Sequence, residues 1–143
     1  MNADGRILRL TKASMAVTDI GFLLYWAVTL LALVPARYAY KDYENPVLSA
    51  WNYSFVLLDV AASLTGLAAL RLRRRGGQAA ALPLMLVSLA LTSTAGLQAI
   101  AFWALRNDFS LTWWLPNLFL LLFPLPGAVL IIRQLTAGHG KQV

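Results

Sequence analysis

The segment 14–34 reads SMAVTDIGFLLYWAVTLLALV, and its only charged residue is Asp19. Its length matches the roughly 20 residues that a helix needs to cross a bilayer. Three further apolar segments follow at 50–70, 80–105 and 112–132. Backbone groups in lipid must be satisfied internally, and no alternating strand pattern appears, so each segment predicts a helix. The expected fold is all-α: an integral membrane four-helix antiparallel bundle, with 1–143 as a single transmembrane domain.

The composition places the chain among membrane proteins. It is 59% hydrophobic and only 13% charged, with a mean hydropathy of +0.65, whereas soluble domains contain about 25% charged residues. There is no cysteine, which excludes a disulfide framework. The net charge of +6 does not indicate nucleic-acid binding, because the basic residues gather at the ends of the apolar segments.

The basic residues also predict the orientation in the membrane. Nine of the twelve Lys and Arg residues precede the first apolar segment, join the second to the third, or follow the fourth. The positive-inside rule therefore predicts that both termini and the loop at 71–77 are cytoplasmic. We expect a multi-pass protein of a cell membrane.

Two acidic residues lie within apolar segments, Asp19 in the first and Asp59 in the second. A carboxylate in hydrocarbon costs at least about 2.5 kcal/mol, and such residues usually face a bundle interior or a cavity. Asp59 belongs to a helical stripe of small and polar residues, which predicts that it faces inward. In an up-down bundle the first two helices are neighbours, so we expect both acids on one cavity wall, at different depths. The stripe consists of Asn52, Val56, Asp59, Ser63 and Gly66.

Other polar and aromatic residues are candidates for contacts with a substrate in such a cavity. Asn52, Gln98 and Asn117 are amides that can orient a ligand. The π faces of aromatic side chains can stabilise a cation, although ordinary packing and an interfacial aromatic belt are the alternative readings. The aromatic candidates are Trp26, Phe55, Phe102 and Trp113.

Two further patterns concern helix packing. Ser88, Thr92 and Gly96 form a ridge of small residues at four-residue spacing, which is typical of close helix contact in lipid. The sequence LFPLPG at 122–127 predicts a kink in the fourth helix, because proline removes a backbone hydrogen bond.

The available side chains restrict the chemistry. No apolar segment contains histidine, and there is no Cys/His cluster, so we expect no metal, no cofactor and no histidine-based nucleophilic triad. Acid–base chemistry by Asp19 and Asp59 remains. A neutral carboxylic acid in an apolar pocket can act as a donor toward a lipophilic substrate.

Three stretches resemble the YvaD-like family of small bacterial membrane proteins: TDIGFLLYW at 18–26, YKDYENPVLSAWNYSF at 40–55 and LDVAASLTGL at 58–67. This resemblance covers about the first half of the chain and implies a bacterial-type cell membrane, but no activity.

The chain also distantly resembles the EXPERA group, which includes the sigma-two receptor and the emopamil-binding sterol isomerase. The features that it shares are Asp19, Asp42 with Pro46, and Asp59. This likeness implies binding of sterol-like molecules in a bundle cavity. The isomerase pattern includes an intramembrane histidine that is absent here, which argues against sterol isomerisation itself.

These observations leave several functions open. The first is an integral-membrane enzyme for acid-initiated cyclisation or isomerisation of an isoprenoid-like substrate, comparable to terpene cyclases, with Asp59 and Asp19 as catalytic residues. The second is a non-catalytic lipophile-binding or accessory membrane protein. A small proton-coupled transporter is the third, although no inverted repeat is visible. The expected partners are a lipophilic isoprenoid or sterol-like molecule and membrane lipids, with a possible homodimer and no nucleic acid.

Overall fold

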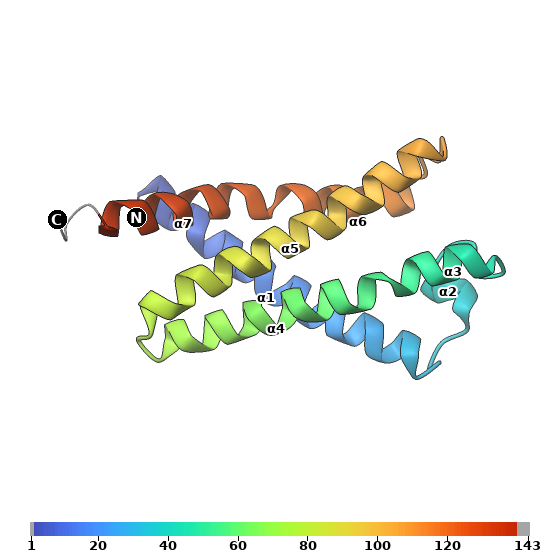
Figure 1. The fold of residues 1–143 in the computed structure, drawn as a ribbon, viewed down its shortest axis with the longest axis horizontal. Coiled ribbons are helices and arrows are strands. Elements are labelled where there is room, and N and C mark those ends of the chain that lie inside the picture. Colours follow the sequence, from blue (N-terminus) through green and yellow to red (C-terminus); the bar gives the residue numbers. More distant parts are fainter. Residues whose placement is uncertain (1, 140–143) are drawn as a thin grey trace.

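A computed structural model describes residues 2–139 (Figure 1). The described residues form helices and connecting loops, with no strand among them. The helices are α1 (Ala3–Leu30), α2 (Ala36–Ala39), α3 (Pro46–Tyr53), α4 (Phe55–Arg74), α5 (Gln78–Leu105), α6 (Leu111–Leu122) and α7 (Pro124–His139).

Four spans are long and apolar enough to cross a membrane, which confirms the all-helical, four-span prediction. They are α1, the α3–α4 pair as Pro46–Arg74, α5, and the α6–α7 pair as Leu111–Ala137. The first helix begins eleven residues earlier than the apolar segment from residue 14, because the side chain of Asn2 caps it by accepting from the Gly5 amide at 3.0 Å. Hydropathy therefore locates the apolar part of the helix, whereas the capping residue determines where the helix begins.

The predicted kink in the fourth span is confirmed as a break between α6 and α7 at Phe123–Pro124. Proline has no N–H, and its ring crowds the preceding turn. Ser93 of α5 donates its hydroxyl to the Leu121 carbonyl at 2.9 Å, which ties the end of α6 to α5.

A second break lies at Ser54, between α3 and α4, where the sequence predicted one helix over 50–70. The Ser54 hydroxyl donates to the carbonyl of Trp51 at 2.6 Å. Such local side-chain bonds compete with the helical backbone pattern. The composition of this segment gives no sign of the break.

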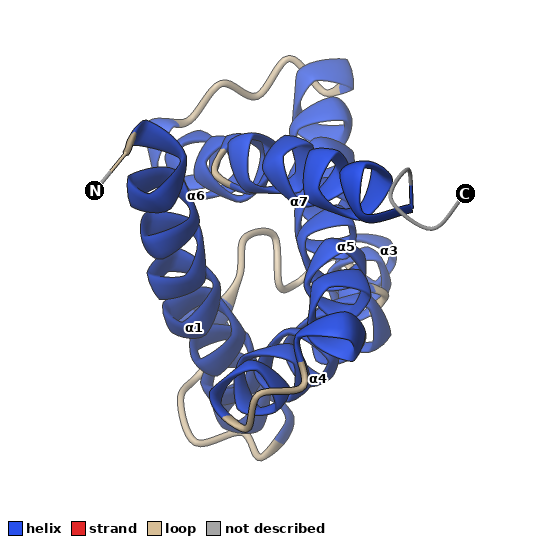
Figure 2. Ribbon diagram, turned by 90° about the vertical axis from the view of Figure 1, so that its left-hand side faces the viewer, coloured by secondary structure: helices blue, strands red, loops and turns tan. Residues whose placement is uncertain are grey.

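The long helices form a bundle in which α5 is central, packing against α4, α6 and α7 (Figures 1 and 2). Helix α1 crosses α4 obliquely and also contacts α7. The predicted small-residue ridge on α5 is buried, and a Cβ on Gly96 would lie only 2.5 Å from the backbone nitrogen of Leu121 on α6. The ridge therefore allows close helix contact, as expected.

The two ends of the bundle differ. We call the end where α1 begins and α7 ends the terminal end, and the end that carries α2 and the loop at 106–110 the distal end (Figure 1). A solid apolar cluster fills the terminal half. Its buried members are Met15, Ala69, Leu82, Met85, Leu89 and Ile131.

Candidate functional site

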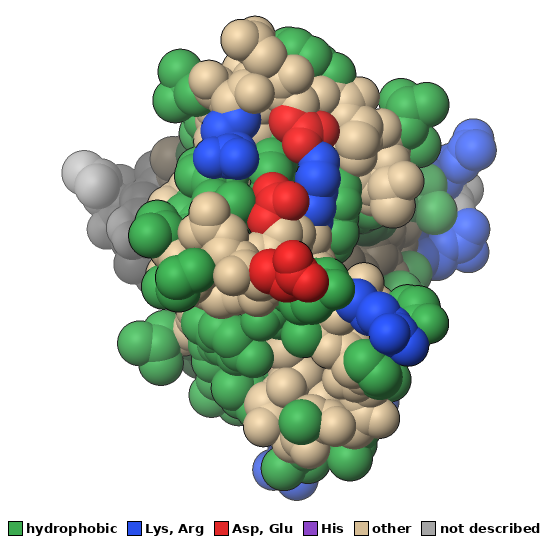
Figure 3. All heavy atoms as spheres, turned by 90° about the vertical axis from the view of Figure 1, so that its right-hand side faces the viewer, with side chains coloured by type: hydrophobic (Ala, Val, Ile, Leu, Met, Phe, Trp, Pro, Cys, Tyr) green, Lys and Arg blue, Asp and Glu red, His purple; other side chains and the backbone are tan. Residues whose placement is uncertain are grey.

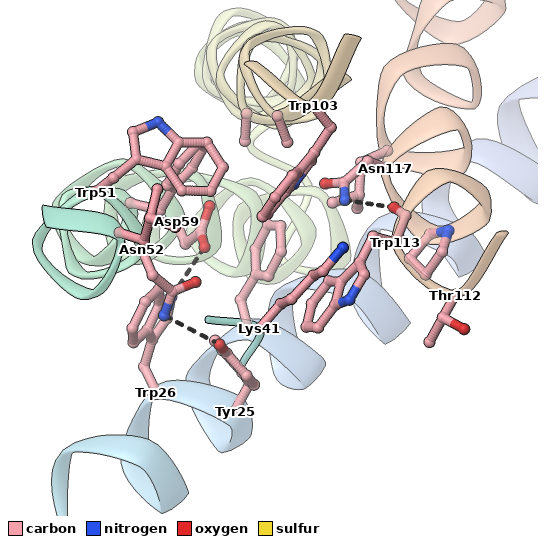
Figure 4. A pocket seen from close by; sticks show the side chains of 17 residues that line it. Tyr25, Trp26, Lys41, Trp51, Asn52, Asp59, Trp103, Thr112, Trp113 and Asn117 are labelled. Atoms are coloured by element: carbon pink, nitrogen blue, oxygen red, sulfur yellow. Dashed lines mark hydrogen bonds between the residues drawn. The ribbon is translucent and has the colours of Figure 1, made fainter. Parts of the chain in front are cut away.

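The distal half contains a cavity of about 220 Å³, here called the aromatic pocket (Figure 4). Side chains from α1, α3, α4, α5 and α6 line it, together with Lys41 from the loop before α3. Its lining residues are Phe22, Tyr25, Trp26, Lys41, Leu48, Trp51, Asn52, Phe55, Asp59, Ala95, Ala99, Trp103, Thr112, Trp113, Pro116, Asn117 and Leu120.

Asp59 is the buried acid of this pocket, with 5% of the residue exposed. Its stripe on α4 is oriented as predicted, since Ser63 and Gly66 are buried one and two turns further along the same face. Oδ2 accepts a hydrogen bond from Trp26 Nε1 at 2.8 Å. Oδ1 has no partner among the described residues. One carboxylate oxygen is therefore held by α1, and the other is buried without a hydrogen-bond partner among the described residues.

Aromatic rings form much of the wall around this carboxylate. Trp26 meets the ring of Tyr25 edge-on, with centroids 4.8 Å apart. Trp51 meets Phe55 and Trp103 edge-on, at 5.0 and 5.6 Å. Behind Trp51 lies Phe102, stacked on it at 3.9 Å. Edge-on contacts pair the positive edge of one ring with the negative face of another, so these rings hold one another in place.

Three further lining side chains, those of Tyr25, Asn52 and Asn117, take part in hydrogen bonds. Asn52 donates through Nδ2 to the Tyr25 hydroxyl at 3.4 Å, and that hydroxyl donates to the Ala39 carbonyl at 3.2 Å. Asn117 donates through Nδ2 to the Trp113 carbonyl at 2.7 Å. These amides therefore have partners of their own within the protein.

Lys41 lies at the distal end of the pocket (Figure 4). Its ammonium group pairs with Asp108 in the α5–α6 loop and lies 5.0 Å from the ring centroid of Trp103. Sequence reasoning did not select Lys41, because a lone lysine in a loop of mixed charge carries no distinguishing pattern. The hydrogen bond from Lys41 lowers the pKa of Asp108.

Asp19 lies away from this pocket, which contradicts the expectation that both acids open onto one cavity. It precedes Trp26 by seven residues, so it lies about 10 Å closer to the terminal end along the same helix. The residue is fully buried. A Cβ built on Gly66 would lie 2.0 Å from Asp19 Oδ2 and 2.6 Å from Ser88 Oγ, so the carboxyl group is packed where α1, α4 and α5 meet.

This packed acid is also incompletely satisfied. Neither oxygen of Asp19, nor the hydroxyl of Ser88, has a hydrogen-bond partner among residues 2–139. The absence of Cβ at Gly66 is what provides the space for the carboxyl group. We refer to Asp19, Gly66 and Ser88 as the packed acid site.

Six of the nine predicted site residues therefore line one pocket: Trp26, Asn52, Phe55, Asp59, Trp113 and Asn117. Three do not. Asp19 lies in the packed acid site, Phe102 supports Trp51 from behind, and Gln98 is exposed on the surface of α5. Gln98 points outward because it precedes the pocket residue Ala99 by one position, a rotation of about 100° on a helix with 3.6 residues per turn.

Comparison with known proteins identifies a family. A family model described as "Family of unknown function (DUF5360)" matches residues 11–139. The chain is also 42% identical over 127 residues to "Uncharacterized protein YvaD" of Bacillus subtilis (strain 168), which covers 89% of this chain and 95% of that protein. No solved structure matches. The suggested likeness to the EXPERA group has no support in these comparisons.

Proposed function

We propose that this chain, which belongs to the YvaD-like DUF5360 family of unknown function, binds a lipophilic small molecule in the aromatic pocket. The ligand presents a cationic group or a hydroxyl group to Asp59. The remainder of the ligand lies against the aromatic walls.

The observation that carries this proposal is the free Oδ1 of Asp59. A buried acceptor without a partner costs free energy, and a ligand that donates a hydrogen bond or brings a positive charge removes that cost. The opposite oxygen is fixed by Trp26, so the acceptor is already oriented. Cations also favour the faces of tryptophan and tyrosine, by about 0.5–2 kcal/mol. Both features select a cationic head in preference to an anionic one.

The geometry supports binding more strongly than two-residue acid–base catalysis. Asp59 is the one carboxylate among the described lining residues. The second intramembrane acid, Asp19, lies in the packed acid site instead. A catalytic scheme with Asp59 as acid and Asp19 as base requires both to reach one substrate.

The test uses purified protein in nanodiscs of fixed lipid composition and dodecyltrimethylammonium as the probe. A ligand that binds only the folded state raises the unfolding temperature, so thermal unfolding reports binding. We expect Asp59→Asn to bind about 10- to 100-fold more weakly, because the amide removes the charge opposite to that of the probe, and two unit charges about 4 Å apart near a protein surface attract each other by up to about 4 kcal/mol.

Asp19→Asn is the matched control, because it is the same substitution at the other intramembrane acid. It should leave the affinity for the probe unchanged. Equal weakening by both substitutions, or by neither, contradicts the assignment of Asp59. Replacing the probe with dodecanol then shows whether the site prefers a positive charge or a hydroxyl group.

Acid-initiated cyclisation or isomerisation of an isoprenoid-like substrate is the second candidate function. The combination of a buried carboxyl group with aromatic faces that stabilise carbocations favours it. In this case Asp59→Asn should reduce product formation by about 10²–10⁴-fold, the usual contribution of one general acid. Full turnover by that variant excludes Asp59 as the proton donor.

A further inference from the structure

We infer that the aromatic pocket opens sideways into the membrane between α1 and α6, and that its ligand is an amphiphile whose tail lies in this opening. The inference rests on the proposed binding function and adds the ligand's shape and its route of entry. The opening is called the lateral portal.

The first observation is that α1 and α6 do not pack against each other. Helix α1 packs against α4 and α7, whereas α6 packs against α5. Both α1 and α6 contribute lining residues to the pocket, yet the two helices make almost no contact with each other. None of the residues of α6 is buried. Figure 1 shows the two helices diverging toward the distal end.

The break at Phe123–Pro124 is the structural origin of the portal. On the terminal side of the break, α7 packs against α1, and a Cβ on Gly127 would lie 2.4 Å from the side chain of Thr11. On the distal side, α6 is held to α5 by the bond from Ser93 to Leu121 and by the close approach at Gly96. The fourth span therefore contacts α1 along one half only.

The size of the pocket argues for a ligand that extends beyond it. A cavity of roughly 150 Å³ holds one benzene molecule, so the 220 Å³ here accommodates a head group and a few carbons. A lipophilic molecule with a longer chain must leave part of it outside. Chain that leaves through the portal stays in hydrocarbon, which a long alkyl group strongly favours.

The distal end is a poorer exit for an alkyl chain. The ion pair between Lys41 and Asp108 joins the two connecting segments at this end, and the nearby residues Tyr40 and Leu48 are buried. Figure 3 shows acidic and basic side chains side by side on this face. The segments 36–45 and 106–110, which lie at the distal end, together carry three basic and three acidic residues. Placing an apolar tail among hydrated charges forgoes the hydrophobic gain.

A substitution on α1 tests the portal without changing the pocket lining. Gly21 precedes the lining residue Tyr25 by one helical turn and so lies on the same face, and a Cβ at Gly21 meets nothing within 4 Å. A tryptophan at this position occupies the portal side of α1. Leu24 is 61% exposed on the same helix and is not part of the lining, so Leu24→Trp is the matched control.

The measurement compares two probes, dodecyltrimethylammonium and tail-free benzyltrimethylammonium, by thermal unfolding in nanodiscs. Gly21→Trp should weaken the long-tailed probe at least about tenfold, equivalent to about 1.4 kcal/mol. It should leave the tail-free probe unchanged, and Leu24→Trp should affect neither. Unchanged binding of the long-tailed probe to Gly21→Trp overturns the portal, whereas failure of the wild type to bind either probe overturns the proposed function itself.

A photoreactive probe gives an independent result. A dodecyltrimethylammonium derivative with a diazirine at the tail end should label residues on the lipid-facing surfaces of α1 and α6. Labelling concentrated in the loops at 36–45 or 106–110 shows that the tail leaves through the distal end, which overturns the lateral portal while leaving the proposed binding function intact.

Discussion

The two intramembrane acids occupy opposite kinds of environment, although both lie on inward faces of neighbouring helices. Asp59 borders a cavity, has one bonded and one free oxygen, and is surrounded by aromatic rings. Asp19 is enclosed by close packing against Gly66 and Ser88. The comparison shows that position within an apolar segment identifies an unusual residue but does not assign its role. Space beside the carboxyl group distinguishes the candidate ligand site from the packed one.

The largest expected effect concerns the packed acid site. Gly66→Ala places a Cβ within 2.0 Å of Asp19 Oδ2 and 2.6 Å of Ser88 Oγ, so two side chains must move. Overpacking of this kind typically costs about 1–3 kcal/mol, and we expect the upper part of that range. Unfolding of the purified protein in detergent measures the loss. Binding of a probe in the aromatic pocket should change little.

Gly21→Ala is the control for this prediction, because its Cβ meets nothing within 4 Å. It should leave stability unchanged or raise it by up to about 1 kcal/mol, the difference in helix propensity. The double substitution Gly66→Ala with Asp19→Ala should recover part of the loss, because the shorter side chain frees the space. No recovery indicates that the carboxyl group is not the source of the crowding.

A smaller effect is expected at the pocket acid. Trp26→Phe removes the N–H that donates to Asp59 at 2.8 Å and leaves the carboxyl group without its partner. Loss of a partner costs a buried polar group about 1–3 kcal/mol. We expect a value near 1 kcal/mol, because the cavity beside Asp59 leaves its side chain room to turn, whereas Asp19 is closely packed. The same substitution in an Asp59→Leu background should cost less, and a double-mutant cycle measures the difference.

The smallest effect concerns the distal ion pair. The hydrogen bond from Lys41 lowers the pKa of Asp108 below its ordinary value of 3.8. Because the folded pKa is lower than the unfolded one, the pair stabilises the protein above about pH 4, and this contribution is lost as the pH falls through the folded pKa. The unfolding temperature should therefore fall slightly less between pH 7 and pH 3 for Asp108→Asn than for wild type. An Asp108→Asn curve that coincides with the wild-type curve contradicts this contribution of the ion pair.

The all-helical fold class and the number of spans follow from local composition. Uninterrupted apolar runs leave the backbone no partner in lipid except itself, so the four spans are readable without tertiary information. The break at Phe123–Pro124 is equally local, because proline lacks the donor that the helix requires. The inward face of Asp59 follows from helical periodicity, which places Ser63 and Gly66 on the same side. The break at Ser54 was not predicted. A serine in such a segment does not by itself indicate a break, and the sequence does not show whether its hydroxyl group will bond to a backbone carbonyl such as that of Trp51.

The residues that line the pocket could be predicted only in part from the sequence. Trp26, Asn52 and Phe55 were selected together with Asp59, and all four line the pocket. Gln98 shows the limit of this reasoning. A polar residue in an apolar segment suggests an inward position, but the direction of a side chain depends on which neighbours pack against each face of α5. Lys41 is the opposite case, because it lines the pocket but was not predicted to do so. Only the position of its loop in the folded protein brings it there.

By itself the sequence determined that the chain forms four membrane-length helices, that two of them carry acids on their inward faces, and that the fourth is interrupted. Each of these follows from interactions within a few residues: backbone hydrogen bonding, helical periodicity and proline geometry. Only the tertiary structure decided that Asp59 borders a pocket while Asp19 is packed against a glycine, and that α1 and α6 both line that pocket with almost no contact between them. These outcomes depend on the crossing of helices that are distant in sequence, and the space between helices is not encoded in any one of them.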